Sequence, residues 1–332
     1  MPEVTPPEDW PLLFEDALAC PHDPGLSVLL DHAARGAVAR RDAGGTFWRA
    51  LDDDVAGPLL LAATPRGREL VIRGWSSVKW AGEAAPAPTG WNEGDAFHLA
   101  RAWVGLDDDG WGEEVLDGHP LTRELRRRLG PLRLSSVLSV QEAVGRAVLG
   151  QLVQFREAER SAAQLVRLAG REVGGLHAWP TQRALLKLET WDLRRRCGMS
   201  MRGVAALRAA AFDDARLSRL AREHRWDEFD AVLGALPGVG VWTSAVARLA
   251  LGDPDAVPFG DYHLPSLVCH ALSDGAEPPG GWTDAHLAEL LEPFRPQRGR
   301  VVRLLLQGAM RRQGPRPARR APHAPLSAHR YW

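Results

Sequence analysis

Cysteine is scarce in this chain, and its few cysteines are far apart. The 332 residues contain three, Cys20, Cys197 and Cys269, and no C-x-x-C pair. An odd number of distant cysteines builds neither a disulfide framework nor a four-cysteine iron–sulfur cluster. The sequence therefore predicts a protein of a reducing compartment that carries no iron–sulfur cluster.

Long apolar runs are also missing. No stretch approaches the roughly 18 uncharged apolar residues that a membrane-spanning helix needs, and the first ten residues are acidic and proline-bearing. We therefore expect a cytoplasmic protein with no membrane partner. A hydrophobic fraction of 45% still allows a sizeable core, and the length suggests roughly two domains.

Lysine is rare, and acidic residues are absent from the end of the chain. Only Lys79 and Lys187 are lysines, so guanidinium groups carry nearly all the positive charge. The formal net charge is -1, yet no Asp or Glu follows Glu292, whereas ten arginines lie between Arg295 and Arg330. Arginine pairs well with phosphate, so this basic end favours an anionic partner, although a solvated charged end fits equally well.

Strand-like and helical patterns occupy different parts of the chain. Short segments rich in aromatic and branched residues, separated by Asp, Gly and Pro, predict an antiparallel meander over residues 46–51, 58–63 and 69–75. No strand is expected after this first third. The predicted fold class is therefore α+β, with an N-terminal α+β domain that carries the antiparallel sheet (residues 1–115), a mainly α-helical domain (116–313) and a Pro/Arg-rich tail (314–332).

Helical patterns are well defined from Ser139 onward. Ser139 and Glu142 match the S-x-x-E capping box, in which the hydroxyl accepts the third helical N–H and the carboxylate returns to the cap. Apolar residues then recur at helical spacing on both sides of Gly150, which predicts two helices joined there. Further helices are expected over residues 182–188, 203–212, 226–233, 242–251, 284–291 and 299–312.

The run L-P-G-V-G-V-W-T, residues 236–243, separates two helical patterns. Pro237 cannot continue a helix, and the two glycines can adopt positive φ, so the run predicts a tight turn that ends at a helix N-terminus. Unpaired N–H groups at that N-terminus suit a phosphate, and Thr243 could add a hydroxyl donor. A plain turn between packed helices fits the same run equally well.

Asp261 lies nineteen residues beyond Trp242, in the segment P-F-G-D-Y-H. A single carboxylate after Gly260, flanked by aromatic and apolar residues, could lie beside the hairpin and be partly desolvated. An Asp close to a helix that begins near Leu264 could instead serve as its N-cap. The residues themselves leave both interpretations open.

Two blocks of sequence carry a family resemblance. The L-P-G-V-G-V-W-T run followed by G-D-Y, together with A-V-L-G-Q-L-V at residues 147–153, resembles the helix-hairpin-helix (HhH-GPD) DNA glycosylase superfamily, and most of all DNA-3-methyladenine glycosylase II. The similarity covers residues 44–310. It implies a helical HhH-GPD domain preceded by a small sheet. It also implies a monomeric enzyme of base-excision repair whose partner is double-stranded DNA containing damaged, alkylated purines.

The resemblance also implies a role for each motif residue. Asp261 would be the catalytic carboxylate, which stabilises a developing oxocarbenium sugar. A damaged base must leave the stack to be reached, and Leu152 would fill the vacated space, although a place in the core remains open for this leucine. The implied DNA-binding residues are Gln151, Leu152, Gly238, Val239, Gly240 and Thr243, and the implied base-pocket residues are Trp242 and Tyr262.

Cofactor needs follow from the same resemblance. Lyase-competent members carry a Schiff-base lysine where this chain has Trp242, which implies a monofunctional glycosylase that leaves an abasic site. No cofactor is required, but the hairpin often holds a structural monovalent cation, here through the carbonyls of Gly234, Leu236 and Val239. His263, Cys269 and His270 lie close in sequence, but no second ligand cluster accompanies them, so no metal site is predicted.

Three positions depart from the family pattern. Gln154 stands where a serine usually caps the next helix, and Val246 and Leu306 stand where the related glycosylase has aromatic residues. These changes leave the preferred lesion open. A non-catalytic helix-hairpin-helix protein that only binds duplex DNA is therefore the alternative function.

Overall fold

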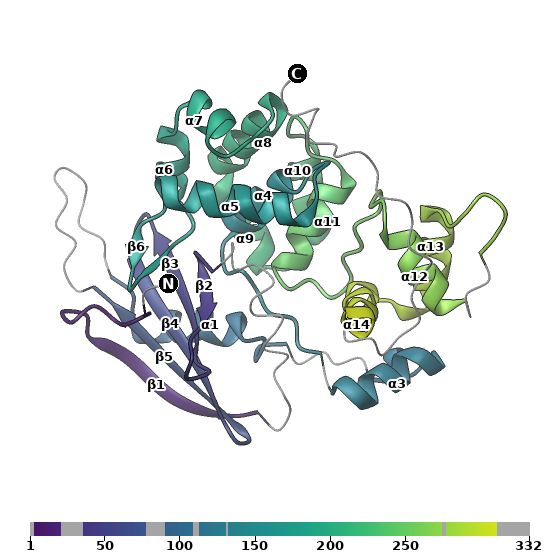
Figure 1. Cartoon of the computed structure of the whole chain (residues 1–332), viewed down its shortest axis with the longest axis horizontal. Helices are drawn as coiled ribbons and strands as arrows, with labels where there is room; N and C mark the ends of the chain where they lie inside the picture. Colours follow the sequence, from purple (N-terminus) through teal and green to yellow (C-terminus); the bar gives the residue numbers. More distant parts are fainter. Residues whose placement is uncertain are drawn as a thin grey trace.

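An antiparallel sheet and a larger helical part pack side by side in this chain (Figure 1). The computed structural model describes residues 3–20, 36–77, 90–108, 113–130, 132–273 and 277–310. The predicted α+β class is confirmed. The predicted tail, residues 314–332, lies outside the described residues.

Five strands form the sheet in the order β1-β5-β4-β3-β2, with antiparallel pairing throughout. The predicted meander is confirmed as β3, β4 and β5. Strands β1 and β2 were not expected, because β1 is mostly exposed and β2 has only three residues, so neither shows a clear apolar alternation. The strands are β1 (Leu12–Ala19), β2 (Ala39–Arg41), β3 (Phe47–Asp53), β4 (Gly57–Arg66) and β5 (Glu69–Ser76).

The expectation of no later strands is wrong. Two-residue strands β6 (Glu172–Val173) and β7 (Leu176–His177) pair in a second sheet. They are too short for a periodic pattern, but the Gly174-Gly175 turn between them, with φ of 56° and 82°, is a recognisable hairpin signal. Val173 and Leu176 are buried in one apolar cluster with residues of β3 and β4.

Fourteen α-helices occur in the described part of the chain. Each helix expected from the sequence is present, with described ends shifted by at most two residues, and the pair joined near Gly150 is α4 and α5. Residues 311 and 312, expected in the last helix, lie outside the described residues. The helices are α1 (Glu93–Trp103), α2 (Glu113–Leu116), α3 (Pro120–Leu129), α4 (Val140–Leu149), α5 (Phe155–Ala169), α6 (Gln182–Lys187), α7 (Thr190–Arg195), α8 (Met201–Phe212), α9 (Asp214–Arg222), α10 (Trp226–Gly234), α11 (Val241–Ala250), α12 (Leu264–Leu272), α13 (Asp284–Leu291) and α14 (Arg298–Met310).

The predicted capping box at the start of α4 forms only in part. The Ser139 hydroxyl accepts the Glu142 N–H at 3.3 Å, as expected. The Glu142 carboxylate does not serve the cap: it is fully buried and accepts from Arg49 of β3 and Arg146 of α4. A carboxylate buried in the core is stable only with cations beside it, and this requirement takes precedence over capping.

The apolar core is divided into several clusters. One joins the sheet to α1, a second gathers α4 to α11, and a third gathers α3 and α12 to α14. The predicted boundary between residues 115 and 116 falls within α2. The segment from α11 to α12 passes from the second cluster to the third, and Asp261 lies on this segment.

Candidate active site

The predicted hairpin joins α10 to α11. Gly238 has φ of 84°, which favours glycine, and Gly240 is the N-cap of α11, whose first turn receives no side-chain cap. A Cβ built on Gly240 would meet no atom within 4 Å. The N–H groups of the first turn of α11 therefore lie beside open space, as an incoming phosphate requires.

Charged side chains hold the two helices of this hairpin together. Arg248 of α11 donates to Asp230 of α10 at 2.5 Å and to Asp253 at 2.7 Å. The Ser244 hydroxyl donates to the other oxygen of Asp230 at 2.5 Å. The hairpin is thereby fixed on a rigid frame.

Gln151 connects the loop after α4 to the hairpin. Its side-chain amide donates to the Gly238 carbonyl at 2.8 Å and to the Thr243 hydroxyl oxygen at 2.9 Å. Thr243 is 3% exposed. Two side chains predicted as DNA contacts thus meet each other. Of the predicted contacts in the turn, Gly240 is exposed, Gly238 is partly covered and Val239 is buried, at 8% exposure.

Leu152 extends from this loop into solvent. It is 75% exposed, and its φ of 56° is unusual for a residue other than glycine. A place in the core is therefore excluded for Leu152. Phe155, the first residue of α5, is also exposed, at 72%, and was not singled out from the sequence. The preceding N-cap, Gln154, makes no side-chain cap, as its replacement of serine suggests.

The carboxylate of Asp261 lies beside the first turn of α11. Its Oδ2 accepts from the Trp242 indole N–H at 3.2 Å, and its Oδ1 accepts from the N–H groups of His263 at 2.8 Å and Leu264 at 3.0 Å. Asp261 therefore lies beside the hairpin helix, whereas the N-cap of α12 is His263 and Asp261 only accepts backbone N–H groups at the start of that helix. Trp242 lies against the loop after α4 as well, since a Cβ on Gly150 would be 3.4 Å from its ring.

Comparisons with known proteins show what this chain is similar to. No protein-family model matches the chain. Over 168 residues it is 32% identical to the probable bifunctional transcriptional activator/DNA repair enzyme AlkA of Mycobacterium tuberculosis, covering 48% of this chain and 33% of the relative. The chain thus matches about a third of the length of that curated relative.

Solved structures resemble nearly the whole chain. The 3-methyladenine DNA glycosylase from Archaeoglobus fulgidus superposes with a TM-score of 0.69 at 22% identity, covering 90% of this chain and 98% of that one. The apo form of the 8-oxoguanine glycosylase/lyase from Clostridium acetobutylicum gives 0.64 at 14% identity, covering 90% and 99%. The chain has the fold of the helix-hairpin-helix DNA glycosylases. The fold expected from the sequence motifs is confirmed.

The other residues at positions that the family resemblance links to a base pocket differ in exposure. Tyr262 is 52% exposed and packs edge-on against His263, with ring centroids 4.8 Å apart. Val246 and Leu306 are partly buried against the second and third apolar clusters. The aromatic surface close to Asp261 is therefore supplied by Trp242 and Tyr262.

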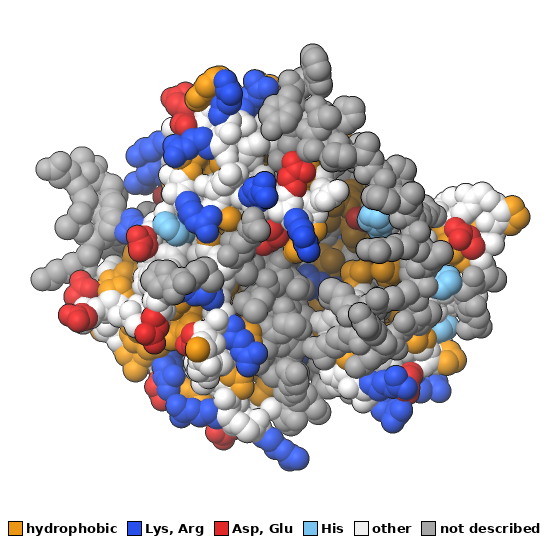
Figure 2. All heavy atoms as spheres, in the orientation of Figure 1, with side chains coloured by type: hydrophobic (Ala, Val, Ile, Leu, Met, Phe, Trp, Pro, Cys, Tyr) orange, Lys and Arg blue, Asp and Glu red, His pale blue; other side chains and the backbone are white. Residues whose placement is uncertain are grey.

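Arg202 contributes a cation to the hairpin that sequence reasoning did not assign. Its side chain lies over Gly238, where a Cβ would come within 2.5 Å of Cγ and 3.0 Å of Nε. Arg202 is exposed at the start of α8, and no carboxylate of the described residues pairs with it. The only sequence signal for this role is the Arg202-Gly203 pair, which lies within the region of family similarity. Figure 2 shows further Lys and Arg side chains over the region of α5 to α7.

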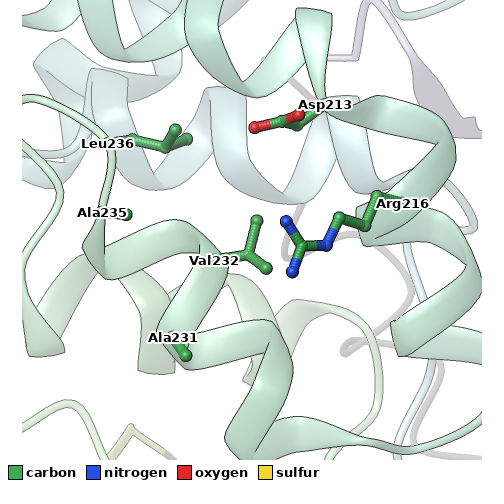
Figure 3. Close-up of a pocket in the computed structure, with 6 residues that line it drawn as sticks. All are labelled: Asp213, Arg216, Ala231, Val232, Ala235 and Leu236. Carbon is green, nitrogen blue, oxygen red and sulfur yellow. The ribbon is translucent and has the colours of Figure 1, made fainter.

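One hollow lies on the other side of the hairpin, between α9 and α10. It has a volume of about 280 Å³ and is lined by Asp213, Arg216, Ala231, Val232, Ala235 and Leu236 (Figure 3). Arg216 and Asp213 both extend into it from α9 and its N-cap, across from the α10 residues. None of the predicted catalytic or base-pocket residues lines this hollow, so it is separate from the Asp261 site.

The described residues offer no site for a conventional metal. They contain no group of three or more His, Cys, Asp or Glu side chains arranged to hold an ion. Burial raises the pKa of Cys197 to about 12 and that of Cys269 to about 11, so these thiols stay protonated near neutral pH.

None of the helices in the described ranges is long and apolar enough to cross a membrane.

Proposed function

We propose that this chain is a monofunctional DNA glycosylase of base-excision repair that removes alkylated purines. The observation that carries the proposal is the Asp261 carboxylate held against Trp242 at the start of the hairpin helix. Single-carboxylate chemistry suits a cationic alkylated purine, because such a base needs little protonation to leave. What the site must supply is negative charge near the sugar and an activated water.

The proposed reaction cleaves one bond and forms one. The N-glycosidic bond breaks with its electron pair moving to the base, and the sugar C1′ develops oxocarbenium character that the ionised Asp261 stabilises. Water then bonds to C1′ and gives up a proton, with Asp261 as the acceptor. Hydrogen bonds from Trp242, His263 and Leu264 keep the carboxylate oriented throughout.

The DNA strand would be gripped by the hairpin. The exposed Gly240 borders the open space at the α11 N-terminus, directly after Gly238 and the buried Val239, and Arg202 places a guanidinium close to Gly238. A phosphate there would meet N–H donors, a helix dipole and a cation. We further propose that a monovalent cation binds the carbonyls of Gly234, Leu236 and Val239.

Leu152 would occupy the space left by the extruded base. Its exposure and positive φ support this role, because an apolar side chain in solvent gains burial only when a partner covers it. Gln151 would position the loop through its bonds to the hairpin rather than read a base. Trp242 and Tyr262 would contact the flipped base through their ring faces.

Excision assays test this function. Purified protein is incubated with duplexes carrying 7-methylguanine, hypoxanthine or 8-oxoguanine, and abasic sites are revealed by alkali. Asp261→Asn keeps an oxygen for the His263 and Leu264 N–H groups but removes the charge, so we expect excision to slow by about 100-fold or more. Asp227→Asn, an exposed acid on α10, is the matched control.

Each possible result has a defined meaning. Excision by Asp261→Asn at the wild-type rate would contradict the catalytic assignment. Strand breaks without alkali would contradict a monofunctional enzyme. Duplex binding with no base released from any substrate would favour the DNA-binding alternative. That alternative is motivated by Val246 and Leu306, which stand where the related glycosylase has aromatic residues.

A further inference from the structure

Asp284 reaches from the start of α13 to the loop that carries Asp261. Its Oδ2 accepts the backbone N–H of Gly260 at 2.8 Å, across 24 residues of sequence. Asp284 belongs to neither of the sequence blocks that carry the family resemblance. It is nevertheless the side chain that holds the peptide unit directly before the catalytic candidate.

The loop needs an anchor at this point. Gly260 is exposed and has φ of 88°, a conformation that glycine adopts readily and leaves readily. The bonds made by Asp261 itself reach Trp242 and the backbone that follows, His263 and Leu264. On the preceding side, the Asp261 N–H donates to the Pro258 carbonyl at a long 3.3 Å and the Phe259 N–H donates to the Val257 carbonyl at 2.8 Å. The bond at Gly260 differs from both because it ties the turn to another helix.

Asp284 is itself held firmly. It is the first residue of α13, whose N-cap Thr283 forms a capping box with His286. Leu287 and Leu291 of the same helix are fully buried in the third apolar cluster. A carboxylate at a helix N-terminus is also stabilised by the helix dipole. The anchor is therefore a rigid element, in contrast to the exposed glycine that it restrains.

The second oxygen of Asp284 supports a purpose beyond simple packing. Its Oδ1 is buried and has no hydrogen-bond partner among the described residues. A buried carboxylate oxygen without a partner lowers the stability of a fold, and such features often occur at functional sites. The unsatisfied oxygen of Asp284 is therefore consistent with a functional role for the bond at Gly260.

We propose that Asp284 is a positioning residue for excision: it fixes the Gly260 peptide unit and thereby sets where the Asp261 carboxylate lies against the sugar. This inference rests on the proposed role of Asp261. Asp284 touches neither base nor sugar. Its removal therefore impairs the chemical step and leaves DNA binding, which belongs to the hairpin, largely intact.

Three substitutions at Asp284 separate position from charge. Asp284→Ala removes the acceptor, Asp284→Asn keeps an oxygen at the same distance without the charge, and Asp284→Glu keeps the charge but moves the acceptor by one methylene. We measure single-turnover excision of 7-methylguanine, the Kd for a duplex with a tetrahydrofuran abasic-site analogue, and the thermal unfolding midpoint. Glu289→Ala, an exposed acid on the same helix, is the control.

The expected pattern is specific. Asp284→Ala and Asp284→Glu slow single-turnover excision about 10- to 100-fold, as misplacement of a reacting group by about 1 Å does. Asp284→Asn stays within about threefold of wild type because its oxygen still accepts the Gly260 N–H. Kd changes by less than about twofold in all of them, since phosphate contacts carry affinity. The Glu289→Ala control matches wild type.

Other patterns overturn the inference. Wild-type excision by Asp284→Ala would show that the bond is dispensable, and a slow Asp284→Asn with a fast Asp284→Glu would show that charge, not position, matters. If Asp284→Ala does not fold, the Asn and Glu pair decides by itself. Failure of the glycosylase function is distinguishable, because wild-type protein would then release no base, whereas failure of this inference leaves wild-type activity and the Asp261→Asn defect in place.

Discussion

Leu152 combines an apolar side chain that is largely exposed to solvent with a positive backbone φ. An isolated apolar side chain in solvent is ordinary, but one on a backbone with positive φ stores strain as well. Strain of this kind persists only when surrounding contacts impose it, and here the bonds of the neighbouring Gln151 to Gly238 and Thr243 do so. The loop is thus prepared for contact with a partner.

Replacing Leu152 tests whether that partner is the DNA stack. We expect Leu152→Ala to slow excision more from a fully paired duplex than from mismatched or single-stranded DNA, because extruding a base costs a few kcal/mol less in the latter. Single-turnover rates on the three substrates measure the difference. Val55→Ala, an equally apolar and exposed change in the turn between β3 and β4, should leave all three rates unchanged. Equal losses on every substrate would contradict a wedge.

Strand β3 meets the segment directly before β6 at the carboxylate of Asp52, which pairs with Arg171. Burial raises the pKa of Asp52 to about 6, although Arg171, 3.1 Å away, works in the opposite direction. The folded protein therefore binds this proton more tightly than the unfolded chain, whose carboxyl has a pKa near 3.8. Protonation of Asp52 consequently stabilises the junction between these two elements.

This titration predicts a pH-dependent stability. The contribution of Asp52 to the free energy of unfolding is fully present below about pH 4 and is lost as pH rises through about 6. Asp52→Asn should remove this part of the pH dependence and raise stability near neutral pH, as measured by urea unfolding across that range. Glu172→Gln, an exposed carboxylate of β6, is the control. An unchanged pH profile in Asp52→Asn would show that burial does not perturb this group.

At the scale of the whole molecule, a buried ionic network joins the sheet to the helical part. Arg49 of β3 is 1% exposed and donates to Glu142 of α4 at 2.5 Å and to the Val137 carbonyl at 2.6 Å. Arg146 approaches the other oxygen of Glu142 at 2.9 Å. Arg146 also donates to Glu159 of α5 at 3.1 Å, so Glu142 is shared by two guanidinium groups of which Arg146 has a second carboxylate partner.

Removing that carboxylate should weaken the whole assembly. We expect Glu142→Ala to lower the free energy of unfolding by about 3–5 kcal/mol, because it leaves the buried Arg49 guanidinium without a counter-charge, whereas Arg146 keeps Glu159. Chemical denaturation monitored by tryptophan fluorescence measures the loss. The control, Glu124→Ala, breaks a largely exposed pair with Arg127 on α3 and should cost about 1 kcal/mol or less. Similar losses in both variants would argue against a network that joins the two parts.

The sequence by itself determined the elements and the fold class. The meander, the two helices around Gly150 and the glycine-containing hairpin were readable because each depends on local periodicity, capping or a backbone conformation that only certain residues favour. The short strands β6 and β7 escaped because two residues carry no period. Asp261 could be singled out, but whether it capped a helix or lay beside the hairpin could not be decided from its neighbours.

Tertiary structure alone decided how those elements meet. It placed Asp261 against Trp242, turned Gln151 and Thr243 toward each other, and brought Arg202 and Asp284 to the site from helices far along the chain. It also directed the Glu142 carboxylate to Arg49 instead of the helix cap. The physical reason is the same in each case. Burial and long-range pairing depend on which surfaces pack together, and the residues adjacent in sequence do not determine that packing.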